Sequence, residues 1–331
     1  MLPVYRSLSK EQVVPSPFWP LTKTYLESGK LTLLISNCPS HRILAPQDVT
    51  KTWAEMVGFP LPLGEHLTQA RVAQVYSVQE SEKKAKEHYL QSLKDMLMGR
   101  AQAHPDEVDP GLVTRLGRDY RSRTFSELAF RLGYPRYDQE QQDPLRLLAE
   151  LPVHTYITTS HHDFIEVALR RAGKEPRTEI CRWHKGLEGI PSVFEDDYQP
   201  TKEEPLVYHL HGSNAYPGSL VLTEDDHMEF LVAISQNIGR DTDPIPRRVR
   251  QAMADSSLVL LGYTLCNWDF RVLFWGLIKP RPLHQTSVSV QLEPGELERN
   301  YLQKYLSEFE FQIYWGDVYQ YAQELRQALV E

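Results

Sequence analysis

A short apolar run that ends in two histidines carries the clearest chemical signal in this sequence. Residues 205–214 read Pro-Leu-Val-Tyr-His-Leu-His-Gly-Ser-Asn, with His209 and His211 two positions apart. Alternate side chains of a strand share a face, so we expect both imidazoles to point the same way, and Gly212 lets the backbone turn directly after them. Such an imidazole can act as a general base, although a histidine at a strand end is more often a hydrogen-bonded structural residue.

A second cluster of polar side chains follows another apolar run. The residues Thr158-Thr159-Ser160-His161-His162-Asp163 come after a β-branched stretch at 153–158 and before a predicted helix at 164–171. In α/β folds, loops at the carboxyl ends of parallel strands bind ligands. A metal site is an alternative interpretation, because His209 and His211 could converge with His161, His162 and Asp163 on one ion.

The first predicted strand, at 31–36, is followed by a loop and by a helix expected from Asp48 to Val57. This order is typical of nucleotide-binding folds, in which the loop places phosphate on the helix N-terminus. Residues 37–42, however, contain no glycine. A side chain or a proline ring at the tightest point keeps a diphosphate from the backbone amides. The loop is therefore a plain surface loop, or it holds phosphate through the side chains of Ser40 and Arg42.

The remaining elements indicate an α/β protein. Residues 20–30 predict a helix that ends at Gly29, and residues 63–135 are mainly helical by the spacing of their apolar side chains. Further strands are expected at 219–223, 257–262 and 286–292, and an amphipathic helix at 319–330. This pattern predicts a Rossmann-like parallel sheet flanked by helices, with a helical insertion or cap between its first two strands.

Composition limits the kind of partner and compartment. The net charge of −8 argues against direct nucleic-acid binding, which needs clustered Lys and Arg. The three cysteines are far apart and odd in number, so neither a disulfide framework nor a structural zinc site is indicated. The N-terminus has no charged start followed by an apolar run, and no apolar stretch is long enough to span a bilayer. We expect a cytoplasmic protein.

Four stretches together resemble a known family. They are residues 158–166 (TTSHHDFIE), 211–213 (HGS), 219–225 (SLVLTED) and 260–270 (LLGYTLCNWDF). Their order and spacing resemble the sirtuin-like domains of bacterial antiphage immunity. The resemblance implies a Rossmann-like sheet with a helical insertion, in a family whose members typically cleave NAD+ at the nicotinamide–ribose bond. It runs from about Trp19 to the C-terminus, which predicts an N-terminal arm at 1–18 and a single domain at 19–331 with its insertion at about 63–150.

The resemblance also assigns roles to individual residues. His211 matches the family's catalytic histidine, which acts as a base near the nicotinamide ribose. Ser160 stands where the family has an asparagine that orients water and ribose, and His162 stands where it has an aspartate. These three are the predicted catalytic residues. The predicted NAD+-binding residues are Thr158, Thr159, Asp163, Gly212, Ser213, Gly262, Tyr263, Ser36 and Asn37.

Several positions depart from the family pattern, and they leave more than one function open. The family's glycine-alanine-glycine phosphate loop falls on residues 36–40 and is not present, and Asn267 stands where an acid is usual. The first hypothesis is a pseudoenzyme that binds nucleotide or assembles with others. The second is an active NAD+ glycohydrolase that uses His211 as base, and the third is a metal-dependent hydrolase. Protein deacylation is disfavoured because the chain has no four-cysteine zinc module. We expect a homo-oligomer that acts with a defence-system partner protein.

Overall fold

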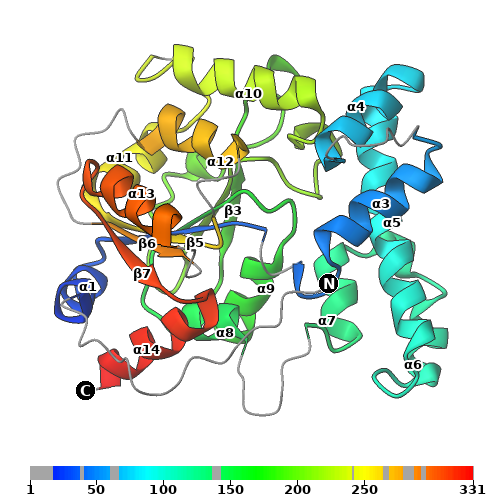
Figure 1. Cartoon of the computed structure of the whole chain (residues 1–331), viewed down its shortest axis with the longest axis horizontal. Coiled ribbons are helices and arrows are strands. Elements are labelled where there is room, and N and C mark those ends of the chain that lie inside the picture. The colour runs from blue at the N-terminus through cyan, green and yellow to red at the C-terminus, as the bar shows by residue number, and fades with distance from the viewer. Residues whose placement is uncertain are drawn as a thin grey trace.

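The computed structural model describes residues 18–37, 41–59, 67–135, 143–240, 242–263, 268–278, 287–291 and 296–330. These residues form a parallel sheet with helices on both faces and a helical body to one side of it (Figure 1). The predicted N-terminal arm lies outside the described residues except for Phe18. None of the described helices is long and apolar enough to cross a membrane.

The sheet has seven strands in the order β3-β4-β2-β1-β5-β6-β7, and each neighbouring pair is parallel. The predicted Rossmann-like α/β fold is therefore confirmed. In β1, the side chains of Leu33 and Ile35 join one hydrophobic cluster and that of Leu34 joins the other, as strand alternation requires. The strands are β1 (Leu31–Ile35), β2 (Thr155–Thr158), β3 (Arg177–Ile180), β4 (Leu206–His209), β5 (Ser257–Leu261), β6 (Ser287–Gln291) and β7 (Phe311–Trp315).

Helices cover both faces of the sheet, which explains why its central strands are continuous apolar runs. The face that includes Leu33 is covered by α1 (Phe18–Glu27), α8 (Pro144–Glu150), α9 (Phe164–Arg171) and α14 (Val318–Val330). The face that includes Leu34 is covered by α10 (Glu224–Gln236), α11 (Arg247–Asp255), α12 (Trp268–Leu273), a π-helical turn (Phe274–Ile278) and α13 (Glu296–Ser307).

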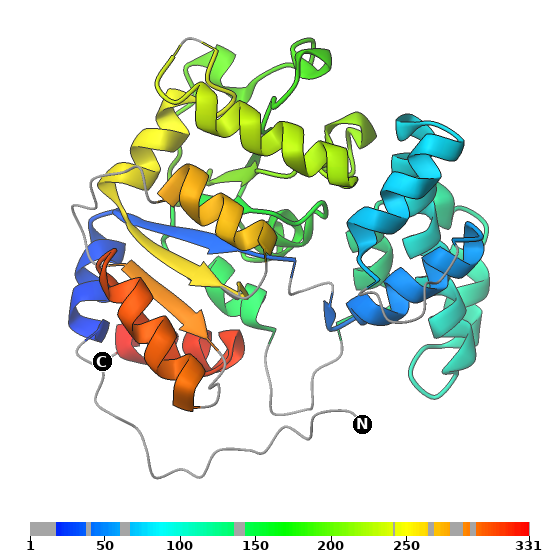
Figure 2. The ribbon, with the colours of Figure 1, turned by 45° about the horizontal axis from the view of Figure 1, so that its top comes forward.

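Between β1 and β2 the chain leaves the sheet and builds a helical insertion (Figure 2). Its helices are α3 (Pro46–Met56), α4 (Gln69–Gln79), α5 (Glu82–Ala103), α6 (Pro110–Leu116) and α7 (Phe125–Arg131). Trp53, Tyr89 and Leu93 are buried in its interior and belong to the same hydrophobic cluster as Leu33 of β1. A second tie is polar: Lys86 Nζ of α5 lies 3.0 Å from Asp226 Oδ1 of α10.

Two differences from the predicted elements have simple causes. The strand expected at 219–223 is wrong: a 3-10 turn (Pro217–Ser219) leads into irregular backbone, and α10 begins directly after its cap, Thr223. The edge strands β3 and β7 were not predicted. An edge strand is covered less completely, and β3 accordingly exposes Arg177 and Thr178 and lacks an apolar run.

Candidate functional site

Four neighbouring strands bring most of the predicted site residues to one edge of the sheet. In the order β4-β2-β1-β5, the carboxyl ends lead into segments that contain His211, Ser160, Asn37 and Tyr263, respectively. Parallel strands end at the same edge, so segments that are distant in sequence lie side by side there. The candidate site is therefore at the carboxyl edge of the sheet.

Hydrogen bonds join the first, second and fifth strands at this edge. Ser36 Oγ donates to the Gly262 carbonyl at 2.8 Å. Thr158 Oγ1 donates to a carbonyl of β1 at 2.7 Å, and the hydroxyls of Thr159 and Tyr263 are 3.2 Å apart. Five of the predicted NAD+-binding residues thus belong to one network.

Ser160 meets a side chain that lies far from it in the sequence. Its Oγ donates to Asn37 Oδ1 at 3.0 Å and accepts from the His162 backbone N–H at 3.1 Å. Asn37 follows β1 and is 123 positions away, so only the pairing of β1 with β2 brings the two together. A carboxamide is thus present beside position 160, although that position itself holds a serine.

His211 is enclosed by aromatic rings. The residue is 7% exposed, and its ring centroid lies 5.6 Å from that of His227 and 5.1 Å from that of Phe230. Burial, followed by the nearby His227 and His161, holds the pKa of His211 well below its usual value. The ring is therefore neutral at pH 7 and carries a lone pair. His227 was not among the predicted site residues. The sequence placed it only in the first turn of a predicted helix, which did not indicate that it lies beside His211.

His209 has a different environment, and the expectation that it shares a face with His211 is wrong. Its Nδ1 lies 2.8 Å from the Ser160 carbonyl, and its Nε2 lies 2.8 Å from Glu166 Oε1 of α9. The two imidazoles diverge because β4 ends at His209, after which alternation no longer applies. Burial lowers the pKa of His209, but the Glu166 carboxylate, the Ser160 carbonyl and Asp163 together outweigh it, and the net pKa is raised. His209 is therefore a structural cross-link.

The paired histidines of the β2 loop pack against the helical insertion. The His162 ring centroid is 4.7 Å from that of Phe125, and His161 lies edge-on to Tyr89 at 6.3 Å. Burial lowers the pKa of each to about 3. Within the described ranges, no group of three or more His, Cys, Asp or Glu side chains is arranged to hold a metal ion, so the metal-site alternative gains no support.

The loop after β4 depends on Gly212. This residue has φ +79°, and a Cβ added there would lie 2.1 Å from the Ser219 carbonyl oxygen. The next residue, Ser213, donates its backbone N–H to Ser219 Oγ at 3.0 Å. Ser213 and Asp163, both predicted NAD+-binding residues, line a cavity beside β3. Gly212 therefore sets the direction of the chain directly after His211.

Of the two side chains predicted as alternative phosphate ligands, Ser40 and Arg42, and of Asn267, which stands where the family has an acid, the structure describes only Arg42. Arg42 is exposed and precedes α3. Ser40 and Asn267 lie outside the described residues.

Comparisons with known proteins agree with the fold. Residues 154–309 match the family model described as the SIR2-like domain. Over 119 residues the chain is 24% identical to the NAD(+) hydrolase ThsA of Bacillus cereus (strain MSX-D12), an alignment that covers 36% of this chain and 21% of that protein. The chain thus matches about a fifth of that relative's length. The predicted resemblance to the sirtuin-like family is confirmed: residues 154–309, which include Ser160 and His211, are similar to the SIR2-like domain.

Proposed function

We propose that this protein is a SIR2-like immunity subunit that binds NAD+ at the carboxyl ends of β1, β2, β4 and β5 and cleaves it weakly or not at all. The observation that carries this proposal is the environment of His211. A general base works best when its pKa lies near the working pH, whereas burial among imidazoles keeps the pKa of His211 well below 6.5. Such a base accepts a proton poorly, and its imidazolium form would face His227 and His161.

Hydroxyl and amide groups support the binding of NAD+. Ser160 with Asn37, and Thr159 with Tyr263, form two polar pairs across the carboxyl ends of β2, β1 and β5. Such groups donate to and accept from ribose hydroxyls. The choice of NAD+ as ligand comes from the match to the SIR2-like domain and from the relative named as an NAD(+) hydrolase.

An active NAD+ glycohydrolase is the second candidate, and one observation favours it. The Asn37 carboxamide lies 3.0 Å from Ser160 Oγ and could take over the orienting role of the family's asparagine. Water would then attack C1′ of the nicotinamide ribose, nicotinamide would leave with the electrons of the broken C–N bond, and neutral His211 would take the proton from water.

A relative named as an NAD(+) hydrolase supports an NAD+-linked role. The defence context of the proposal comes from the resemblance to the sirtuin-like domains of antiphage immunity. Assembly with further copies and with a defence-system partner, in the cytoplasm, would supply the trigger.

The test combines calorimetric titration of the purified chain with NAD+ and a measurement of nicotinamide release. His211→Ala is compared with wild type, and His104→Ala, at an exposed position of the insertion, is the control. We expect saturable NAD+ binding with little or no release. Rapid release that His211→Ala abolishes and His104→Ala preserves would establish the second candidate, and failure to bind NAD+ would reject both.

A further inference from the structure

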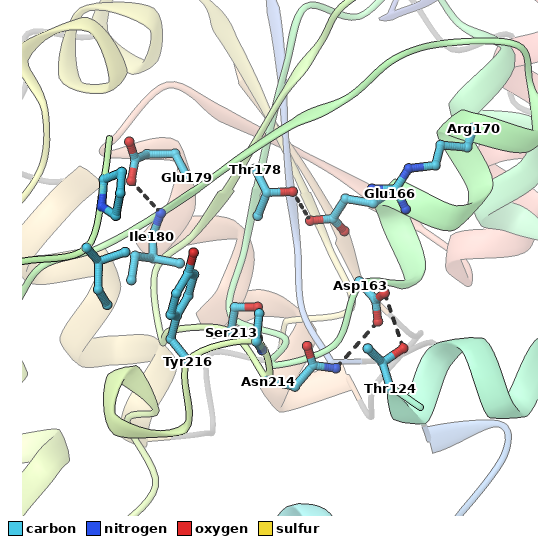
Figure 3. Close-up of a pocket in the computed structure, with 13 residues that line it drawn as sticks. Thr124, Asp163, Glu166, Arg170, Thr178, Glu179, Ile180, Ser213, Asn214 and Tyr216 are labelled. Atoms are coloured by element: carbon cyan, nitrogen blue, oxygen red, sulfur yellow. Dashed lines mark hydrogen bonds between the residues drawn. The ribbon is translucent and has the colours of Figure 1, made fainter. Parts of the chain in front are cut away.

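A cavity of about 250 Å³ lies at the β3 edge of the sheet, bordered by α9, β3 and the loop after β4 (Figure 3). It shares two predicted NAD+-binding residues, Asp163 and Ser213, with the candidate site. Three of its lining residues, Asp163, Glu166 and Arg170, are spaced by three and four positions at the start of and along α9. That spacing places them on one face of the helix. The cavity is therefore lined on one side by two carboxylates followed by a guanidinium.

Glu166 has an unused hydrogen-bond acceptor. The residue is 1% exposed, and its Oε1 accepts from Thr178 Oγ1 at 2.9 Å and faces His209 Nε2 at 2.8 Å. Its Oε2 is buried and has no hydrogen-bond partner among the described residues. Figure 3 shows the Glu166 carboxylate turned into the space among the lining residues. Since a buried carboxylate oxygen without a donor is costly, a donor is missing from this cavity.

The second buried carboxylate in the cavity, Glu179, is fully satisfied. Its Oε1 accepts from the Ile180 N–H at 2.8 Å and from Arg182 at 2.7 Å. Its Oε2 accepts from Ser192 Oγ at 2.5 Å and from the Val193 N–H at 3.1 Å. The contrast shows that the unpartnered oxygen of Glu166 is a local exception.

A count of charges indicates which ligand would suit the cavity. Arg182 neutralises Glu179, and His209 faces Glu166. Among the described residues that line the cavity, two charges remain without an ion pair: Asp163, which accepts long hydrogen bonds from Thr124 (3.3 Å) and Asn214 (3.4 Å), and the exposed Arg170. One negative and one positive charge favour a ligand that carries one of each.

We propose that this cavity binds a small zwitterion, with an ammonium group between Asp163 and Glu166 Oε2 and an acid group at Arg170. An ammonium group has three N–H donors around a compact charge, which suits separate carboxylate acceptors. Arg170 is one helical turn beyond Glu166, about 5.4 Å along the axis, so the two charges of the ligand should be separated by several bonds. An ω-amino acid has this form.

The cavity is linked to the candidate NAD+ site through His209. Glu166 faces one ring nitrogen of His209, and the other faces the Ser160 carbonyl. An ammonium group bound to Glu166 would weaken the interaction of the Glu166 carboxylate with His209. This would in turn weaken the hydrogen bond between His209 and the Ser160 carbonyl of the β2 loop. We therefore expect the zwitterion to change NAD+ affinity, an expectation that rests on the proposed function.

The test is ligand-observed NMR on the full chain, without NAD+, using 4-aminobutanoate, n-butylamine and butanoate as matched probes. We expect 4-aminobutanoate to bind saturably and at least about tenfold more tightly than either singly charged probe. Arg170→Gln, at an exposed position, and Glu166→Gln should each weaken it about tenfold or more. Glu175→Gln, an exposed change outside the cavity, is the control and should leave binding unchanged.

Three outcomes would overturn the proposal: no saturable binding of 4-aminobutanoate, equal binding of butanoate or butylamine, or full affinity in Arg170→Gln. Because Arg170 is exposed, that last result does not depend on whether Glu166→Gln folds. A second titration with NAD+, at saturating 4-aminobutanoate, tests the coupling separately. If NAD+ itself does not bind, the proposed function fails while the zwitterion site stands.

Discussion

Lys86 and Asp226 form an ion pair of 3.0 Å in which the lysine side chain is fully buried and that of the aspartate is 4% exposed. The lysine belongs to the helical insertion and the aspartate to α10, which covers the sheet. Asp226 Oδ2 also accepts from the backbone N–H groups of Leu222 and Thr223 and so caps α10. This pair fixes the insertion beside the helix that carries His227.

Removal of Lys86 should be strongly destabilising. Lys86→Ala leaves Asp226 as a buried charge without its lysine, which costs about 3–5 kcal/mol in the free energy of unfolding. Urea unfolding measures this change. Lys83→Ala, whose side chain is 84% exposed, removes a surface pair and should cost about 0–1 kcal/mol. An equal loss of unfolding free energy in the two variants would contradict the role of the Lys86–Asp226 pair in holding the insertion beside α10.

Gly212 and Gly218 provide a matched pair of glycines. Gly212→Ala places a Cβ 2.1 Å from a backbone oxygen, at a residue whose φ is +79°. We expect a loss of about 2 kcal/mol or more in the free energy of unfolding. We also expect weaker NAD+ binding, because the change displaces His211. A Cβ added at Gly218 would meet nothing within 4 Å, so Gly218→Ala should stay within about 0.5 kcal/mol of wild type. Thermal and urea unfolding of both variants measure the difference.

Stability should fall as the pH is lowered. Burial lowers the pKa of His161 and His162 from 6.5 to about 3, so below pH 6.5 the unfolded chain binds protons that the folded chain does not. Between pH 6.5 and about 3, each contributes a loss of about 1.4 kcal/mol per pH unit, and above pH 6.5 this loss is absent. His209 has a raised pKa, so its contribution is instead lost as the pH rises through its folded-state pKa.

Urea unfolding between pH 5 and 8 tests this pH dependence. His162→Gln should reduce the slope below pH 6.5 by about 1.4 kcal/mol per pH unit. His104→Gln, at an exposed position, is the control for the loss of a histidine that is not buried. An unchanged slope in His162→Gln would show that burial does not lower the pKa of His162.

Ser160 and Asn37 should contribute to NAD+ binding as a unit. Ser160→Ala and Asn37→Ala are each expected to weaken binding by about five- to tenfold, because each loses a hydrogen bond of about 1 kcal/mol and disturbs the other partner. The double variant should be little weaker than either single one, since residues in contact are not additive. Calorimetry gives all four affinities, and strict additivity would mean that the two residues act independently.

The sequence predicted the central strands and the strand-end location of the site, because buried parallel strands are apolar runs and their loops follow directly. It did not predict the edge strand β3, whose Arg177 and Thr178 are exposed. It predicted that His209 and His211 share one face of a strand, but β4 ends at His209 and the two imidazoles point in different directions. The Asn37–Ser160 and Glu166–His209 contacts could not be predicted, since they depend on strand order and on the position of α9.

The hydrophobic cluster shared by the insertion and the sheet has a consequence for how the protein unfolds. Trp53 and Tyr89 of the insertion are continuous with Leu33 and Tyr156 of the sheet, so exposing either part uncovers apolar surface of the other. We therefore expect these two parts to melt in a single cooperative transition, and the insertion, when cut away, to lack a complete core of its own.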